Sequence, residues 1–165
     1  MIQVKIIDCF DLKTLYTNIP HDDLVNKIFD LIHKTFELKE KDFVNVSSNL
    51  NNISWSKCKN PRYVYSYNRE DVKNLLRYLI DNIFVKFRGR IYKQNIGVPM
   101  GCDCAPFLAN LYLFCYEYQY IKDLVNANHW SAAYFKYCRR FIEDLCIPNG
   151  VNDFVKIAKD ILCVI

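Results

Sequence analysis

The sequence predicts an α+β fold, on three observations. Short apolar stretches of strand type lie near both ends of the chain, several stretches between them have helical spacing, and turn residues separate the rest. The expected order is strand, helix, loop, helix, hairpin, helix, hairpin, helix, which is typical of α+β proteins. With 165 residues, 52% of them hydrophobic and 24% charged, the chain is long enough to bury one core. We therefore expect a single domain over residues 1–165.

The first predicted element is a strand over residues 4–10, because apolar side chains dominate this segment. A helix-start signal of asparagine, proline and aspartate follows over residues 18–23. Residues 24–36 then carry apolar side chains at the spacing of one buried helical face. The strand therefore brings Asp11 to its end, shortly before a helix.

The middle of the chain changes in character. Residues 38–60 are charged and then rich in asparagine and serine, so we expect a loop insertion there. Helical spacing resumes over residues 71–85. Residues 84–94 turn over at Arg88-Gly89-Arg90 and predict a β-hairpin.

The last third begins with a glycine- and proline-containing break over residues 97–101. Residues 105–125 are apolar nearly all the way round, which predicts a buried helix. Residues 134–147 are aromatic and β-prone, but Glu143 and Asp144 interrupt them as at a tight hairpin turn. A final amphipathic segment covers residues 154–161.

Composition excludes several classes of protein. The net charge of +4 and the pI near 8.6 tolerate a polyanionic partner without the strongly basic balance of a dedicated nucleic-acid binder. The eight cysteines read as reduced, mostly buried thiols, because no signal-peptide pattern precedes them and only Cys102 and Cys104 form a tight pair. The longest apolar run, residues 105–114, is too short and too polar to cross a bilayer. We expect an intracellular protein that does not associate with a membrane. The sequence does not distinguish a nuclear from a cytoplasmic location.

Carboxylates at two places suggest metal chemistry. Asp11 stands at a predicted strand end, and Glu143 and Asp144 stand at a predicted hairpin turn. Neighbouring strands of one sheet would bring them to a shared site for divalent cations, as phosphoryl transfer by two metal ions requires. The alternatives are a helix-region cap or surface charge for Asp11 and a solvated acidic pair in the turn.

Three motifs, in order along the chain, carry a family resemblance. Residues 10–20 read FDLKTLYTNIP and resemble the first catalytic motif of Penelope-like reverse transcriptases, D-hydrophobic-x-S-L-Y/F-T-N-I-P. Residues 97–101, GVPMG, with AP and LAN shortly after them, are similar to the second motif. Residues 140–144, RFIED, resemble the third, R-aromatic-x-D-D. The match covers most of the chain apart from the asparagine- and serine-rich insertion.

The resemblance implies the palm domain of an RNA-directed DNA polymerase, the reverse transcriptase of a retrotransposon. Its fold would be a palm-like antiparallel sheet backed by helices, with the fingers, the thumb and any GIY-YIG-type endonuclease largely missing from this fragment. Asp11, Glu143 and Asp144 would be the catalytic residues and would bind two Mg²⁺ ions, with Mn²⁺ as an alternative. The implied partners are an RNA template, a DNA primer and deoxynucleoside triphosphates, and the oligomeric state stays open.

The resemblance also implies a nucleotide-binding set. Its members are Lys13, Thr14, Leu15, Tyr16, Gly97, Met100 and Gly101. Tyr16 would clash with a ribose 2′ hydroxyl and so select deoxynucleotides, or would be a buried strand-end aromatic. Gly97 and Gly101 would let the backbone approach nucleotide and template, or would form a turn before a helix. Asn110, polar on an apolar helix, would be functional or else buried and hydrogen-bonded.

One residue departs from the family pattern at a critical position. Glu143 stands where the family has aspartate, and its extra methylene moves the carboxylate by roughly an ångström. A displacement of that size costs catalysis on the order of a hundredfold. We therefore expect weakened or absent polymerisation.

The densest basic cluster lies in the predicted hairpin. Arg88, Arg90 and Lys93 interleave with aromatic residues there, which suits either contact with a nucleic-acid backbone or a solvated hairpin. Two rivals to the polymerase stay open. One is a non-catalytic remnant that binds nucleic acid or protein, and the other is a truncated product that exposes too much apolar surface to fold stably.

Overall fold

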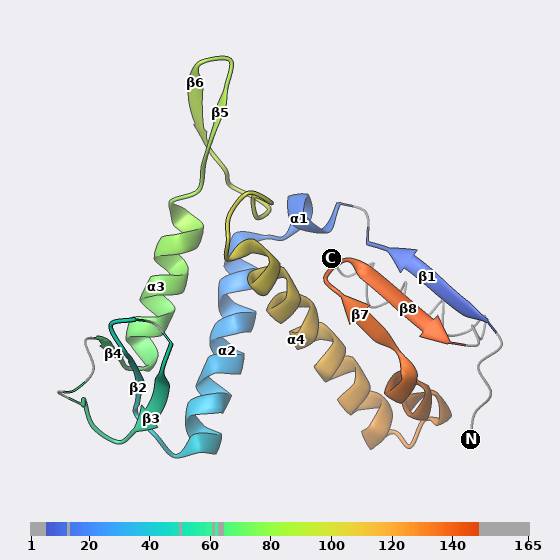
Figure 1. Ribbon diagram of the computed structural model, residues 1–165. Coiled ribbons are helices and arrows are strands. Elements are labelled where there is room, and N and C mark those ends of the chain that lie inside the picture. The colour runs from blue at the N-terminus through green and yellow to red at the C-terminus, as the bar shows by residue number, and fades with distance from the viewer. Residues whose placement is uncertain (1–5, 13, 50, 61, 63–64, 149–165) are drawn as a thin grey trace. The chain divides into compact units, whose positions relative to one another are not determined.

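The computed structural model describes residues 6–148 except residues 13, 50, 61, 63 and 64 (Figure 1). The chain divides into two compact units. Unit 1 comprises Met1–Pro20 and Ile96–Ile165, and unit 2 comprises the intervening His21–Asn95. The helix predicted for residues 154–161 lies outside the described residues.

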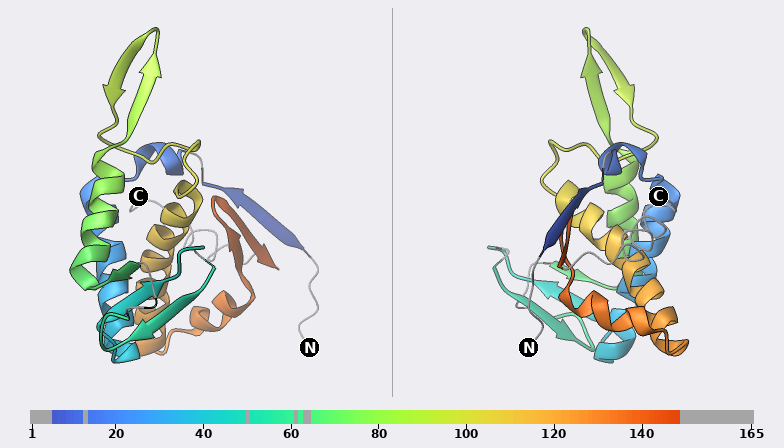
Figure 2. Two further views of the ribbon diagram at one scale, coloured as in Figure 1. Left: turned by 60° about the vertical axis from the view of Figure 1, so that its left-hand side comes forward. Right: turned by 90° about the vertical axis from the view of Figure 1, so that its right-hand side faces the viewer.

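Unit 1 is built on an antiparallel sheet with strand order β1-β8-β7 (Figures 1 and 2). Its elements are β1 (Ile7–Asp11), α1 (Leu15–Asn18), α4 (Ala105–Asn126), the 3-10 helix η1 (Trp130–Tyr137), β7 (Arg139–Phe141) and β8 (Asp144–Pro148). The first strand and the last hairpin, far apart in sequence, therefore form one sheet with β8 at its centre. This confirms the predicted strand near the amino terminus and the predicted hairpin near residue 143.

The sheet of unit 1 has one covered face and one open face. On the covered face Phe10 and Leu145 pack against the buried Ile147, together with Phe135 and Cys138. Side chains alternate between faces along a strand, and the exposed positions of β1 are the ones in between. Asp11 ends β1 on the open face.

Helix α4 matches its predicted bounds but not its predicted burial. Ala105, Leu108, Ala109, Tyr112 and Leu113 are buried and follow the spacing of a single helical stripe. Other apolar side chains of the same helix are exposed, among them Phe107, Phe114 and Tyr118. The prediction of burial all round was wrong because apolar residues occupy the outward positions too, so composition does not separate the two faces.

Unit 2 contains two helices, a three-stranded sheet and a hairpin. Its elements are α2 (His21–Lys39), β2 (Phe43–Val46), β3 (Ile53–Ser56), β4 (Tyr65–Tyr67), α3 (Arg69–Asp81), β5 (Phe84–Phe87) and β6 (Arg90–Lys93). The two helices pack on each other. Leu24, Val25 and Ile28 on α2 and Leu76 and Ile80 on α3 are buried. Arg77 also pairs with Asp22 at 2.6 Å. Both helices confirm the predicted helical spacing.

The loop predicted for residues 38–60 was wrong over the two strands β2 and β3. They join β4 in an antiparallel sheet of order β3-β2-β4. Asn45, fully buried in β2, donates from Nδ2 to Ser56 Oγ at 2.6 Å and accepts from Ser66 Oγ at 2.6 Å. Asn45, Ser56 and Ser66 therefore satisfy one another across three strands. The asparagine and serine residues that suggested a loop, at positions 47–49, 51 and 52, lie between β2 and β3.

The hairpin β5-β6 turns at Arg88 and Gly89, as predicted. Both turn residues have positive φ, 47° and 79°, as a two-residue type I′ turn requires. All eight strand residues are exposed, and Figures 1 and 2 show the hairpin extending beyond the end of α3.

The aromatic segment before β7 forms the 3-10 helix η1, where the sequence predicted a strand. Within the described residues, no helix combines the length and the apolar character needed to span a membrane.

Candidate active site

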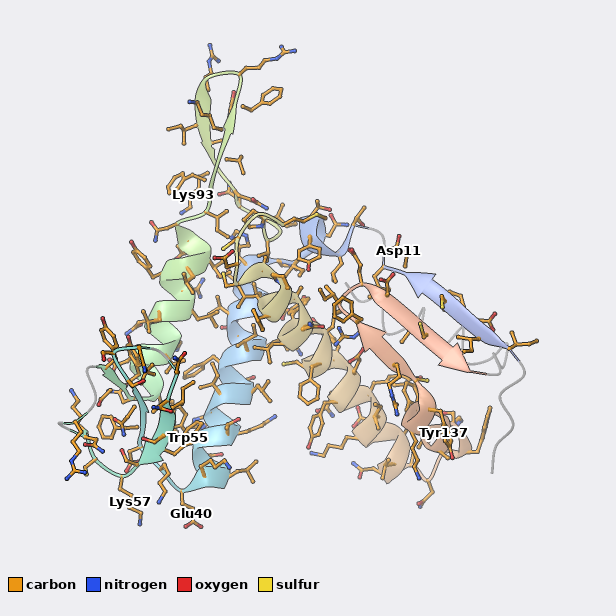
Figure 3. All side chains as sticks on the ribbon, viewed as in Figure 1. Asp11, Glu40, Trp55, Lys57, Lys93 and Tyr137 are labelled. Carbon is orange, nitrogen blue, oxygen red and sulfur yellow. The ribbon has the colours of Figure 1, made fainter. Side chains whose placement is uncertain are left out.

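The predicted catalytic carboxylates come from the two strands that pair at the centre of unit 1. Asp11 is the last residue of β1, and its Cα partner across the ladder is Asp144, the first residue of β8. Just beyond this pair, the Leu12 amide donates to the Glu143 carbonyl oxygen at 2.8 Å. Figure 3 shows Asp11 at the end of its strand. The structure thus joins the first and third sequence motifs at one end of the sheet.

Asp11 and Asp144 carry like charges at directly opposed positions of the β1-β8 ladder. Directly opposed residues of antiparallel strands share a face, and like charges there destabilise the pairing. Asp11 and Asp144 are both exposed, and Glu143 is half-buried in the turn beside them. Two adjacent carboxylates on an open face fit a divalent cation, which would relieve their repulsion.

The third carboxylate does not complete a cluster. Among the residues that the structure describes, no group of three or more acidic, histidine or cysteine side chains is gathered to hold a metal ion. Asp11 and Asp144 face each other in the β1-β8 ladder. Glu143 is not gathered with them into a three-ligand site. The sequence predicted all three as one metal-binding set.

The turn that carries Glu143 has an unusual backbone. Phe141 pairs with Asp144, so Ile142 and Glu143 form a two-residue hairpin loop. Ile142 has a φ of 53°, although a β-branched residue is a strong outlier at positive φ. Such conformations persist only where surrounding contacts hold them.

Tyr16 lies in the one-turn helix α1, which follows β1. Its side chain is 6% exposed, so the structure matches the expected alternative of a buried aromatic, although in a helix and not at a strand end. Burial raises the pKa of its hydroxyl, and the charge of Glu143 raises that pKa further. Tyr16 is therefore close enough to the acidic turn to sense its charge.

The other residues predicted to face the triphosphate differ in exposure. Thr14 is exposed at the start of α1, with a φ of 70°, whereas Leu15 is buried. Lys13 lies outside the described residues. Only Thr14 of these three is both described and open to a nucleotide.

The second motif is bonded to the first through the backbone. The Gly97 amide donates to the Ile19 carbonyl oxygen at 2.8 Å, and the Val98 amide donates to that of Tyr16 at 2.6 Å. Gly97 has a φ of 81°, and a Cβ there would lie 2.5 Å from the Tyr16 carbonyl oxygen. Gly97 thus permits a close approach of two chain segments. The sequence suggested instead an approach to nucleotide and template, or a turn before a helix.

Met100 and Gly101 face open space. The Met100 side chain is 68% exposed, and a Cβ added to Gly101 would meet nothing within 4 Å. Both positions are exposed, and their predicted contact with nucleotide or template stays a prediction.

One functional-looking residue was missed by the sequence. Glu117, on α4, binds the guanidinium of Arg140, and Asn110 on the same helix accepts from Arg140 as well. Asn110 is therefore hydrogen-bonded, one of the two alternatives expected for it. The available signal for Glu117 was an acidic residue directly after the longest apolar stretch of this helix.

The basic residues of the hairpin belong to unit 2. Arg88, Arg90 and Lys93 are all exposed, and the Arg88 guanidinium lies 5.4 Å from the centre of the Phe87 ring. Figure 3 labels Lys93 at the base of the hairpin. The arrangement offers cations and aromatic faces together, without a contact that tests the nucleic-acid prediction.

Comparison with known proteins places the fold. No protein-family model matches the chain, and no curated protein matches it. Among solved structures, telomerase from Candida albicans in complex with a TWJ fragment of telomeric RNA is similar, with a TM-score of 0.59 and 14% sequence identity. The match covers 96% of this chain and 25% of the telomerase chain.

The chain therefore has a mixed α+β fold with small antiparallel sheets, of the kind found in part of that telomerase. More particularly, it resembles part of telomerase, a reverse transcriptase, and spans a quarter of that chain's length. At 14% identity the likeness concerns the fold alone.

Proposed function

We propose that the chain is the palm of an RNA-directed DNA polymerase of the Penelope-like type, which builds DNA on an RNA template. The observation that carries the proposal is the direct pairing of Asp11 with Asp144, because it unites carboxylates from two separate motifs. The fold likeness to part of telomerase supports the same class of enzyme. Since the chain covers a quarter of the telomerase chain, the substrates and partners of a whole polymerase are part of the proposal.

The cofactor in this proposal is Mg²⁺, as two ions, with Mn²⁺ as an alternative. Asp11 and Asp144 would hold the ions, since carboxylate oxygens are the ligands that Mg²⁺ prefers. Glu143, which is not gathered with them in this structure, would have to move toward them to join the set. When bound, the ions stabilise charge on the attacking and leaving oxygens of nucleotidyl transfer. The protein's own contribution is to hold two carboxylates side by side on the open face of the sheet.

Glu143 sets the expected level of activity. It keeps the charge of the family's aspartate and displaces its carboxylate by roughly an ångström, which corresponds to a loss on the order of a hundredfold. We propose a slow polymerase in which shortening this side chain improves the rate.

The nucleotide would lie over the exposed part of the second motif. Met100 and Gly101 are open there, and Thr14 is open at the start of α1. Tyr16 would discriminate against a ribose 2′ hydroxyl from beneath this surface, with its burial holding the ring in place. The neutral hydroxyl that its raised pKa favours suits a steric role.

The nucleic-acid partners in the proposal are an RNA template and a DNA primer. The β5-β6 hairpin offers them Arg88, Arg90 and Lys93 beside exposed aromatic rings. Lysine and arginine neutralise phosphates, and aromatic faces stack with bases of any sequence.

A second candidate function is binding of nucleic acid without catalysis. The specific observation in its favour is that Glu143 is not gathered with Asp11 and Asp144 into a three-ligand group in the described part of the chain. The hairpin would serve this function unchanged.

Extension of a DNA primer on an RNA template by the purified chain, with Mg²⁺ or Mn²⁺, tests the proposal. We expect deoxynucleotide incorporation that Asp11→Asn abolishes and Glu143→Asp raises on the order of tenfold or more. Asp8→Asn is the matched control, because Asp8 is on the same strand and its side chain points to the other face, where it pairs with Ile147.

Each outcome of this experiment decides between the two candidates. No incorporation by any variant, from protein that melts cooperatively, would overturn the polymerase. Metal-independent RNA binding in that case, weakened by Arg88→Gln and Arg90→Gln with a shallower salt dependence, would establish the second candidate.

A further inference from the structure

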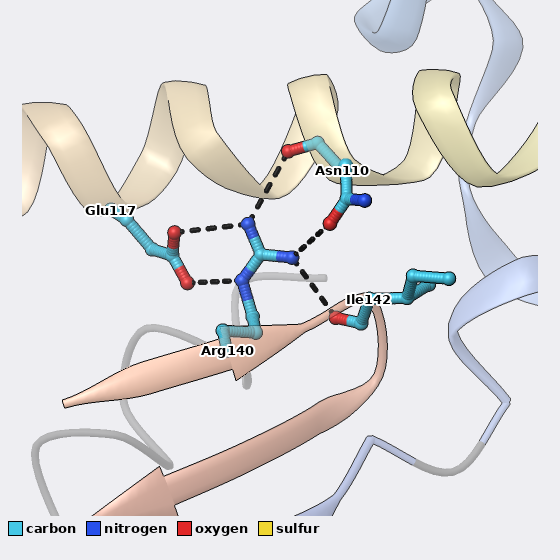
Figure 4. Close-up of polar contacts among 4 residues, drawn as sticks. All are labelled: Asn110, Glu117, Arg140 and Ile142. Carbon is cyan, nitrogen blue, oxygen red and sulfur yellow. Dashed lines mark hydrogen bonds and ion pairs between the residues drawn. The ribbon is translucent and has the colours of Figure 1, made fainter.

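The side chain of Arg140, on β7, joins the acidic turn to helix α4. Its Nε donates to Glu117 Oε1 at 2.5 Å and its Nη2 to Glu117 Oε2 at 3.1 Å, a bidentate pair (Figure 4). Nη1 donates to Asn110 Oδ1 at 2.7 Å, and Nη2 donates to the Asn110 carbonyl oxygen at 3.3 Å. Nη1 also donates to the Ile142 carbonyl oxygen at 3.0 Å.

These contacts use the full donor capacity of the guanidinium. Arginine has five N–H donors in a rigid planar fork, and each of the five has an acceptor here. Lysine has three donors on one nitrogen and cannot reach Glu117, Asn110 and Ile142 in this arrangement. The site is therefore specific for arginine.

The network is shielded from water and links two elements. The side chains of Arg140 and Glu117 are 11% and 26% exposed. Asn110 and Glu117 are seven residues apart on α4, so they lie on one side of that helix. Partly buried ion pairs of this kind fix a register more than they add stability.

Arg140 acts from the face of the sheet opposite to the carboxylates. It pairs with Leu145 in the β7-β8 ladder, and Leu145 packs on the covered face. Asp144, the next residue along, therefore points to the open face. Arg140 lies behind the proposed reacting groups and does not touch them.

The hydrogen bond to the Ile142 carbonyl oxygen connects Arg140 to the backbone of the acidic turn. Ile142 holds a positive φ of 53°, which its branched side chain disfavours, and Arg140 holds its carbonyl oxygen. Releasing that contact would let the turn relax and shift Glu143 and Asp144, the two residues that follow.

We propose that Arg140 is a positioning residue, which anchors the strained turn to α4 through Glu117 and Asn110 and so fixes the two acidic residues that follow Ile142. The inference rests on the proposed function for its catalytic consequence. Its structural consequence, an anchored turn, is independent of that function.

Arg140→Lys is the test variant, and Arg139→Lys is the matched control, because Arg139 is the neighbouring residue of β7, is exposed and donates only to nearby carbonyl oxygens among its described bonds. We expect amide hydrogen exchange to rise at least about tenfold over residues 142–145 in Arg140→Lys, with residues 8–10 of β1 unchanged. In primer extension we expect kcat to fall about ten- to a hundredfold with KM for the nucleotide changed less than about twofold, as for the loss of a supporting contact. Arg139→Lys should change neither.

Glu117→Gln supplies a second variant that keeps the side-chain shape, and it decides the question if Arg140→Lys fails to fold. The same local rise in exchange is expected. Exchange over residues 142–145 equal to that of Arg139→Lys, or a rise spread evenly through the sheet, would overturn the positioning role. A wild-type chain without polymerase activity would refute the proposed function and leave the exchange experiment to decide the anchoring.

Discussion

At the scale of single residues, Gly97 shows how a motif glycine can serve the fold. Its positive φ and its approach to the Tyr16 carbonyl oxygen leave no room for a side chain. The left-handed conformation alone costs a non-glycine residue about 1–2 kcal/mol. We expect Gly97→Ala to lower the free energy of unfolding by more than this, as measured by denaturant titration. Gly101→Ala, in open space, should stay within about 0.5 kcal/mol, and equal losses in both variants would contradict the account.

Tyr16 reports on the acidic turn through its ionisation. Burial and the charge of Glu143 raise its pKa, so the folded state favours the neutral ring. The stabilising effect of the neutral form is complete below the unfolded-state pKa of about 10 and is lost as the pH rises through the higher folded value. We expect Glu143→Gln to lower the Tyr16 pKa without restoring it fully, because burial is the larger cause.

An NMR titration of tyrosine ring carbons measures this shift, with Tyr16→Phe identifying the signal among the 12 tyrosines. A Tyr16 pKa that is the same in Glu143→Gln and in the wild type would show that the two side chains do not interact.

At the scale of elements, the β1-β8 pairing decides whether the site exists. Cys9 and Cys146 are cross-strand partners in this ladder, two residues from the aspartates, and their Sγ atoms lie 3.3 Å apart. Facing positions of antiparallel strands fit the Cα separation of a disulfide. We expect the oxidant diamide to join these two thiols, with diamide accepting the two hydrogens released.

The reaction should accelerate as the pH rises. The hydrogen bond to Cys146 raises the pKa of the Cys9 thiol, so less reactive thiolate is present at neutral pH. Peptide mapping by mass spectrometry identifies the bond, and Cys58→Ser, in the other unit, is the control that should leave it intact. A bond from Cys9 to any other cysteine would refute this register.

Elements with a strong local pattern could be predicted from the sequence. The helical stripes of α2 and α3, the glycine turn between β5 and β6, and the apolar run of β1 each depend on residues close together in the chain. The sheet of unit 2 could not, because Asn45 is buried through partners that only strand pairing brings to it. The exposure of one face of α4 could not be predicted either, because that face also carries large apolar residues.

The candidate site was predictable in part. The sequence motifs identified Asp11 and Asp144, and the ladder pairs them. The pairing of Arg140 with Glu117 was not predictable, because the two residues are 23 positions apart in sequence and only the folded chain brings them together. The burial of Tyr16 likewise depends on chain segments that pack around it in three dimensions.

At the scale of the whole molecule, unit 1 is assembled from two segments of the chain, and the residues of unit 2 separate these segments in sequence. The ladder that unites Asp11 with Asp144 is thus a long-range pairing, and forming it requires closing a long stretch of chain. The proposed metal site requires this ladder to form, because only the ladder brings Asp11 and Asp144 together. The telomerase likeness, over 96% of this chain, supports the arrangement as a fold.

The most direct test of the account is to map a bound divalent ion by NMR, using Mn²⁺ because its unpaired electrons broaden the signals of nearby nuclei. A metal site at these strand ends should broaden the amide signals of Asp11, Leu12, Glu143 and Asp144 most strongly. We expect this broadening to be kept in Asp8→Asn and lost in Asp11→Asn. Broadening centred elsewhere, or unchanged by Asp11→Asn, would contradict a metal site at the β1-β8 strand ends and with it the proposed polymerase chemistry.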